Sequence, residues 1–229
     1  MLKVQKMNVT DKEMRLINKI SKRELNADEV YTFSVAAADD QIDRDMERFS
    51  VKALEKLSEL FVGTPIIFDH DPKAGSQSAR VYAAHTEKKD GVTRLICQAY
   101  MLKENNSELI AKIEGGILKA VSVGCAVGKR VCSVCGKEYG RCSHLKGRDY
   151  GNGTCHFILD EATDAYEISF VAVPAQRNAG VIKRQKSFSL NEGQADSGDG
   201  LKQQELTALR IRLEAADNEL KEFDQNGNE

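Results

Sequence analysis

A cluster of cysteines and a histidine is the most specific chemical signal in the chain. Cys132 and Cys135 form a C-x2-C-G knuckle, and Cys142 and His144 follow it as C-x-H-x2-G. Thiolates and imidazoles at such spacings are the usual ligands of tetrahedral zinc, and four of them leave no open position on the ion for catalysis. We therefore predict a structural Zn²⁺ site formed by these four side chains.

The identity of the fourth ligand stays open in the sequence. Cys155 could replace His144, and His156 is a weaker candidate. The clustered cysteines could also be free thiols or form disulfides, but such reactive clustering is unfavourable and the chain starts with a charged segment rather than an export signal. Cys97 and Cys125 lie outside the cluster and are expected to be buried apolar side chains.

A second set of residues has the chemistry of a hydrolase. His70 follows the apolar run in IIFDHDP, Ser122 is a lone hydroxyl in KAVSVGC, and Glu167 is a carboxylate in the apolar stretch AYEISFVAV. A hydroxyl, an imidazole and a carboxylate are the parts of a nucleophile, base and orienting acid, which have no fixed order along a chain. Spacing alone does not show that the three side chains meet.

Each of these residues also has an ordinary structural interpretation. His70 could be a solvated loop imidazole, Ser122 could bond to a neighbouring backbone carbonyl, and Glu167 could face outward from an edge strand. His85 is a rival histidine, but its place at the end of a predicted hairpin favours solvation.

Apolar periodicity predicts the helices that support these side chains. They are expected at residues 10–24, 51–61 and about 107–114. Thr10 and Glu13 have the spacing of a capping box at the start of the first helix.

Runs of β-branched and small apolar residues predict the strands. Asp90 and Gly91 favour a tight hairpin turn between two of them, and Pro174 ends the last one. The strands are expected at residues 31–38, 64–68, 79–86, 92–101, 117–129 and 165–173. Helices and strands together indicate an α+β fold.

Composition divides the chain into three parts. We expect residues 1–185 to form one folded domain, with the zinc-binding insertion at about 129–157. Residues 186–200 are rich in Ser, Gly, Asn and Asp, which predicts a flexible linker. Residues 201–225 carry apolar side chains at alternating spacings of three and four, the pattern of a short coiled-coil helix that needs a partner helix from its own copy or another protein.

Overall charge and hydropathy exclude two classes of protein. The 229 residues contain 33 Lys plus Arg against 35 Asp plus Glu, so the chain as a whole is not a polybasic nucleic-acid binder. No stretch approaches the roughly 18 apolar residues of a membrane span. We therefore expect a soluble intracellular protein with no membrane partner.

Four segments together resemble a known family. The acidic segment AAADDQIDRDMERFSVKAL, the histidine in PIIFDHDP, the serine in KAVSVGCAVG and the later YEISFVAVPAQRNAGV occur in the order seen in the prohead proteases of tailed bacteriophages. These are capsid maturation serine proteases, and the resemblance spans roughly residues 30–182. It implies a β-barrel wrapped by helices, similar to herpesvirus assembly proteases.

The resemblance also implies roles for individual residues. The family's base falls on His70, its nucleophile on Ser122 and its acidic member on Glu167, with Asp160 and Asp164 as alternatives for the acid. The implied substrates are the major capsid protein and the scaffold protein, and the implied location is the host cytoplasm, inside the assembling procapsid. The linker could be a self-cleavage site, and the tail could join copies of the chain. The cysteine-rich insertion departs from the simplest pattern of the family.

Two hypotheses without catalysis compete with the protease. Residues 129–149 contain six basic residues against two acidic ones, which fits a zinc-dependent module that binds nucleic acid or protein. Zinc-bound thiolates would nearly cancel that excess, and no ladder of aromatic residues accompanies it, so nucleic acid is the less favoured partner. The other hypothesis is a non-catalytic head-assembly protein that acts through its coiled-coil tail.

Overall fold

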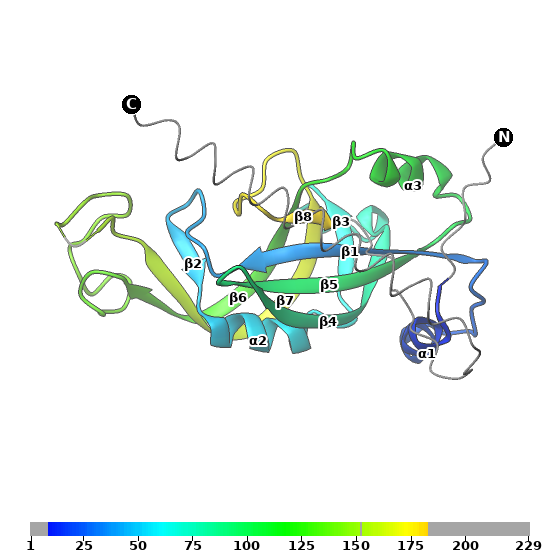
Figure 1. Cartoon of the computed structure of the whole chain (residues 1–229), viewed down its shortest axis with the longest axis horizontal. Helices are drawn as coiled ribbons and strands as arrows, with labels where there is room; N and C mark the ends of the chain where they lie inside the picture. Colours follow the sequence, from blue (N-terminus) through cyan, green and yellow to red (C-terminus); the bar gives the residue numbers. More distant parts are fainter. Residues whose placement is uncertain (1–8, 152, 183–229) are drawn as a thin grey trace, which may run out of the picture. The chain divides into compact units, whose positions relative to one another are not determined.

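The computed structural model describes residues 9–151 and 153–182, which form an α+β fold dominated by one sheet (Figure 1). The predicted linker at residues 186–200 and the predicted coiled coil at 201–225 lie outside the described residues.

The three predicted helices are present near their expected positions. They are α1 (Asp11–Ile20), α2 (Val51–Leu60) and α3 (Ser107–Glu114), and a short 3-10 helix, η1, covers Ala74–Ser76. The backbone N–H of Glu13 donates to Thr10 Oγ1 at 3.3 Å, which confirms the capping box of α1. None of the helices in the described part of the chain has the length and apolar composition of a membrane span.

Eight strands join into a single sheet. Its order is β2-β7-β3-β4-β5-β1-β8, and β6 pairs with the other edge of β7. Strands are found near all the predicted positions, whereas the short strands β2 and β8 were not expected. β7 starts well before residue 165 and ends at Phe170, so Pro174 does not end it as predicted. The strands are β1 (Val30–Asp39), β2 (Glu47–Phe49), β3 (Pro65–Phe68), β4 (Ala79–Lys89), β5 (Val92–Leu102), β6 (Val121–Cys132), β7 (Phe157–Phe170) and β8 (Gly180–Ile182).

The sheet does not close into the barrel that the family resemblance implied. β8 pairs with β1 over only three residues, and within the described residues its link towards β6 is a single bridge between Ala120 and Gly180. The bridge uses Ala120, one residue before β6 begins, so β8 and β6 do not form a continuous ladder. The helices also do not wrap the sheet evenly: α2 packs against β7, β4 and β5, while α1 contacts β4.

β7 organises the part of the sheet that carries the predicted triad residues. β6 pairs along one edge of β7, and the parallel strands β2 and β3 pair with the other edge at its two ends. Ile168 and Phe170 face the main hydrophobic core, which also contains Leu54 and Leu57 of α2. Because side chains alternate along a strand, Glu167 and Ser169 lie on the opposite face of β7.

Candidate functional site

A strained turn positions His70. The turn runs from Phe68, the last residue of β3, to Asp71, whose backbone N–H donates to the Phe68 carbonyl at 2.9 Å. Its two central residues, Asp69 and His70, have φ angles of 51° and 54°. Two positive φ angles inside a hydrogen-bonded turn are the mark of a type I′ turn, and each costs about 1–3 kcal/mol for a residue other than glycine. Such a conformation persists only where its surroundings hold it.

The turn is held by β7. The backbone N–H of Asp69 donates to the Phe170 carbonyl at 3.0 Å, and the backbone N–H of His70 donates to Ser169 Oγ at 2.9 Å. These bonds hold the His70 backbone, and thus the point of attachment of the imidazole, above the polar face of β7.

The structure brings His70 and Glu167 into direct contact. His70 Nδ1 lies 2.7 Å from Glu167 Oε1, and because a carboxylate oxygen accepts, Nδ1 carries the shared hydrogen. The Glu167 side chain is 12% exposed and that of His70 is 46% exposed. The carboxylate is thus shielded from water, while part of the ring remains open to a substrate.

Ser122 lies beside this pair across the β6–β7 ladder. It is directly opposite Ser169, and two residues further along, Gly124 is opposite Glu167. Directly opposite residues in antiparallel strands present their side chains on the same face, about 4.5–5.5 Å apart at Cβ. The Ser122 hydroxyl therefore shares the polar face with Ser169 and Glu167, and it is partly exposed.

Ser122 also lines a cleft with a volume of about 470 Å³. Much of its lining is apolar, including Phe49, Val127 and Leu159. One wall is acidic: Asp43 and Glu47 belong to it, and burial raises the pKa of Asp43 although two backbone N–H groups donate to its carboxylate. Of the three residues, Ser122 alone is among those that line this cleft; His70 and Glu167 are not.

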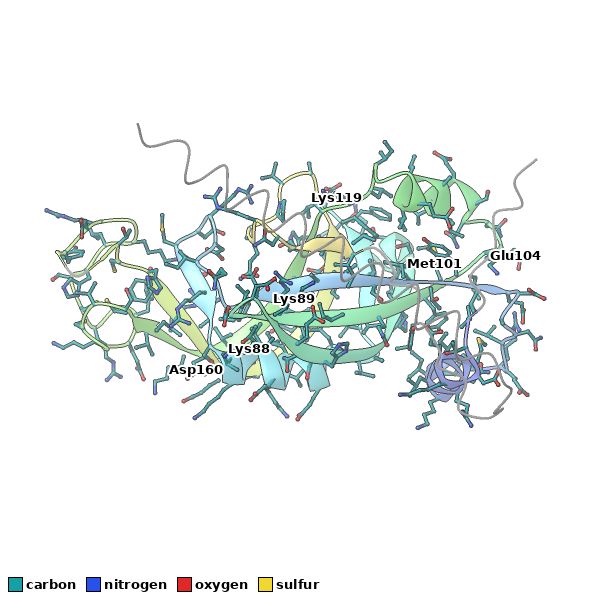
Figure 2. All side chains as sticks on the ribbon, in the orientation of Figure 1. Lys88, Lys89, Met101, Glu104, Lys119 and Asp160 are labelled. Carbon is teal, nitrogen blue, oxygen red and sulfur yellow. The ribbon has the colours of Figure 1, made fainter. Side chains whose placement is uncertain are left out.

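The other residues considered from sequence are engaged elsewhere. Asp160 accepts a hydrogen bond from Ser50 Oγ at 2.6 Å, and this bond lowers the pKa of the Asp160 carboxyl. Ser50 caps α2, and Figure 2 shows Asp160 beside that helix. Asp164 accepts from the backbone N–H of Ala165, and His85 is exposed on the β4–β5 hairpin. Glu167 is the predicted carboxylate that meets His70.

The four predicted metal ligands converge. The donor atoms of Cys132, Cys135, Cys142 and His144, here called the Cys/His cluster, all lie within 4.8 Å of one another. Cys132 Sγ is 3.6 Å from His144 Nδ1. Tetrahedral zinc with bonds of about 2.0–2.3 Å separates its ligand atoms by about 3.5–3.8 Å, so this set fits the ion.

Cys155 lies directly beside the Cys/His cluster. Its Sγ is 3.8 Å from Cys132 Sγ, so it stays an alternative ligand. Burial and the hydrogen bond with Cys132 raise the pKa of Cys155 to about 11. Burial opposes ionisation of Cys132 too, but hydrogen bonds from the backbone N–H groups of Cys135 and Val134 and from neighbouring thiols lower its pKa to about 6. His156, the weakest candidate, instead bonds to Arg48 and to the carbonyl of Thr154.

The cysteine-rich insertion, residues 129–157, packs onto β2. Lys146 Nζ lies 2.5 Å from Glu47 Oε1, and the backbone N–H of Phe157 donates to the Met46 carbonyl at 3.0 Å. Arg48 Nε donates to His156 Nε2 at 3.3 Å. Because Glu47 and Phe49 line the cleft, the insertion supports one of the cleft walls.

The basic excess of the insertion is partly compensated by ion pairs. Three of its six basic side chains have acidic partners within 4 Å: Lys129 with Glu161, Arg141 with Glu138, and Lys146 with Glu47. This pairing reduces the positive field that phosphate binding requires.

Two residues of the site were not singled out from sequence, Ser169 and Gly124. Ser169 donates to Glu167 Oε2 at 2.8 Å, and Gly124 lies under the Glu167 carboxylate. The signal for Ser169 was the alternation in EISF, which puts the serine on the same face as the glutamate. Gly124 could be identified only once the β6–β7 register was known.

Comparison with models of known protein families gives no match, and no curated protein or solved structure matches the chain either. The function is therefore inferred from the geometry of His70, Glu167 and Ser122.

Proposed function

We propose that the chain is a serine endopeptidase of the prohead protease type, with Ser122 as nucleophile, His70 as general base and Glu167 as orienting acid. The observation that carries the proposal is the 2.7 Å contact between His70 Nδ1 and Glu167 Oε1. These two side chains come from separate segments, and Ser122 shares their face of the sheet and lines a cleft. A histidine with a purely structural role would need neither a serine on the same face of the sheet nor a cleft beside that serine.

The reaction follows from the roles of these groups. His70 Nε2 takes the proton from Ser122 Oγ as the oxygen attacks a peptide carbonyl carbon, and the carbonyl oxygen becomes an oxyanion. The intermediate then loses its C–N bond, and His70 gives the proton to the leaving amine. This leaves an acyl group on Ser122. A water molecule, deprotonated by His70, hydrolyses the acyl group and restores the free serine.

Glu167 acts through His70 in this scheme. Its bond to Nδ1 keeps the proton on that nitrogen, so that Nε2 faces the serine as a base. The carboxylate also stabilises the imidazolium that forms when the proton moves.

A structural zinc ion is part of the proposal. Cys132, Cys135, Cys142 and His144 would hold it, with Cys155 as the neighbouring alternative. When bound, the ion supplies a cross-link for a segment otherwise built of turns, and it takes no part in hydrolysis.

The biological role comes from the resemblance of the sequence. In this proposal the enzyme cleaves the major capsid and scaffold proteins inside the assembling procapsid, in the host cytoplasm. The tail at residues 201–225 joins copies of the chain, and residues 186–200 are a self-cleavage site.

The deciding experiment compares wild type with Ser122→Ala, each incubated alone and with the capsid and scaffold proteins, by intact-mass spectrometry. We expect fragments from wild type only. Ser34→Ala is a matched control, since Ser34 is another partly buried serine inside a strand. Cleavage by Ser122→Ala would refute the assignment of the nucleophile. Absence of cleavage by wild type, with zinc bound, would favour a non-catalytic assembly protein.

A further inference from the structure

The Ser169 hydroxyl is bonded to both partners of the His70–Glu167 pair. It donates to Glu167 Oε2 at 2.8 Å and accepts from the backbone N–H of His70 at 2.9 Å. Ser169 is fully buried, with 0% of its surface exposed. A hydroxyl has one proton to donate, and here the carboxylate can only accept and the amide can only donate. The orientation of the hydroxyl is therefore fixed.

These contacts close a ring. The ring runs from Ser169 Oγ to the Glu167 carboxylate, through the 2.7 Å contact to the His70 imidazole, and back through the His70 backbone N–H to Ser169 Oγ. The carboxylate cannot shift without breaking a bond to the buried serine or to the imidazole, and the His70 backbone cannot shift without breaking its own bond to that serine. The ring also holds the positive φ angle of His70.

Gly124 leaves room for the Glu167 carboxylate. A Cβ atom at this position would lie 2.3 Å from Glu167 Oε1 and 3.1 Å from Glu167 Cδ. Any other residue would push the carboxylate away from its present place. The requirement is for space, because Gly124 is not among the residues with positive φ.

We propose that Ser169 is a positioning residue that aligns His70 and Glu167, and that Gly124 leaves the space in which the carboxylate is held. This deepens the proposed function and rests on it, since alignment matters for catalysis only if the pair acts on Ser122. Displacing a reacting group by about 1 Å is sufficient to lower a rate by about 100-fold.

The kinetic test uses the full chain and a peptide substrate. We expect Ser169→Ala to lower kcat by about 10- to 100-fold while KM changes by less than about twofold, because the serine touches no substrate. Ser169→Thr keeps the hydroxyl and is expected to restore most of kcat. An unchanged kcat in Ser169→Ala, or a loss confined to KM, would overturn the proposal.

A matched glycine pair tests the space requirement. Gly124→Ala is expected to lower kcat by a similar factor. Gly128 lies in the same strand, and a Cβ there would meet its nearest atom at 3.4 Å, so Gly128→Ala is expected to keep wild-type kcat. Equal effects of the two substitutions would contradict the role of Gly124. This pair also keeps the proposal testable if Ser169→Ala fails to fold.

A second readout does not depend on hydrolysis. The chain has four histidines, so the hydrogen-bonded Nδ1 proton of His70 can be assigned by NMR from its loss in His70→Ala. We expect its downfield signal in wild type and in Ser169→Thr, and its weakening in Ser169→Ala and Gly124→Ala. An unchanged signal in both latter variants would refute positioning even in an active protease. If the signals behave as expected but the protein cleaves no peptide, the proposed protease function is refuted, whereas the proposal that Ser169 and Gly124 position His70 and Glu167 is supported.

Discussion

His70, Ser122 and Glu167 come from three segments far apart in the sequence, whereas the Cys/His cluster lies entirely between positions 132 and 144. Strand ladders and a buried serine place Glu167 against His70 and put Ser122 on the same face of the sheet, through contacts within the protein itself. The second set is placed by turns of the insertion. Although burial opposes ionisation of Cys132, hydrogen bonds from backbone N–H groups lower its pKa to about 6, while burial and the hydrogen bond with Cys132 raise the pKa of the neighbouring Cys155 to about 11.

This difference separates two ways of building a site. A hydrogen-bonded sheet orders side chains before any ligand arrives, which is what catalysis requires. Several thiolates held close together repel one another until a cation neutralises them, so the metal proposed for the Cys/His cluster would stabilise the insertion when bound.

The largest effect is expected from the proposed nucleophile and base. Ser122→Ala and His70→Ala should each lower kcat by at least about 10⁴-fold, and the double variant should lose no more than the worse single variant, because the residues act as a unit. Steady-state assays and thermal melts measure this. If the losses of kcat were additive in the double variant, or if the melting temperature fell together with the activity, the residues would have a structural role instead.

Removing the carboxylate of Glu167 is expected to have the next largest effect. Glu167→Gln should lower kcat by about 10²- to 10⁴-fold, because the amide no longer fixes the imidazole tautomer. Glu161→Gln is the control, since Glu161 is an exposed glutamate of the same strand. Comparable losses in both variants would contradict a specific role of Glu167.

Loss of the metal should affect the two regions unequally. After removal of zinc by a chelator we expect the native mass to fall by about 63 Da and residues 129–157 to lose protection from hydrogen exchange. The turn at His70 should keep its protection, and kcat/KM should fall by less than about tenfold through loosening of the β2 wall. Uniform loss of protection would show that the metal supports the whole sheet.

The smallest effect is expected where Ser50 meets Asp160. Ser50→Ala removes the cap of α2 and should cost about 1 kcal/mol of stability at neutral pH. The bond from Ser50 lowers the pKa of Asp160 below its usual value of 3.8, so its contribution is present above that pH and is lost as the pH falls below it. The difference between wild type and variant in urea melts should therefore shrink at low pH. Activity should not change.

The sequence was sufficient for features with a local cause. The C-x2-C-G knuckle predicted the converging ligands, and the pair Asp90 and Gly91 predicted the β4–β5 turn, where both residues have positive φ. Helix caps and apolar runs likewise located the three helices and the longer strands.

Features that depend on pairing between distant segments were not predictable. The choice among Glu167, Asp160 and Asp164 follows from the β3–β7 pairing, which brings His70 to Glu167, and the place of Ser122 follows from the β6–β7 register, which shifts at two irregularities. β2 and β8 have three residues each and exist only because a neighbouring strand pairs with them. The prediction of a β-barrel was wrong for the same reason, because closing the sheet into a barrel would require β8 to pair with β6.

The length of β7 separates the Cys/His cluster from the His70–Glu167 pair. The strand begins at Phe157, beside the metal ligands, and carries Glu167 near its other end, roughly 30 Å away at the usual rise per residue. That separation is several times the Debye length of about 8 Å at physiological ionic strength. We therefore expect a charge gained or lost at an exposed position of the insertion to change the electrostatic potential at His70 only slightly.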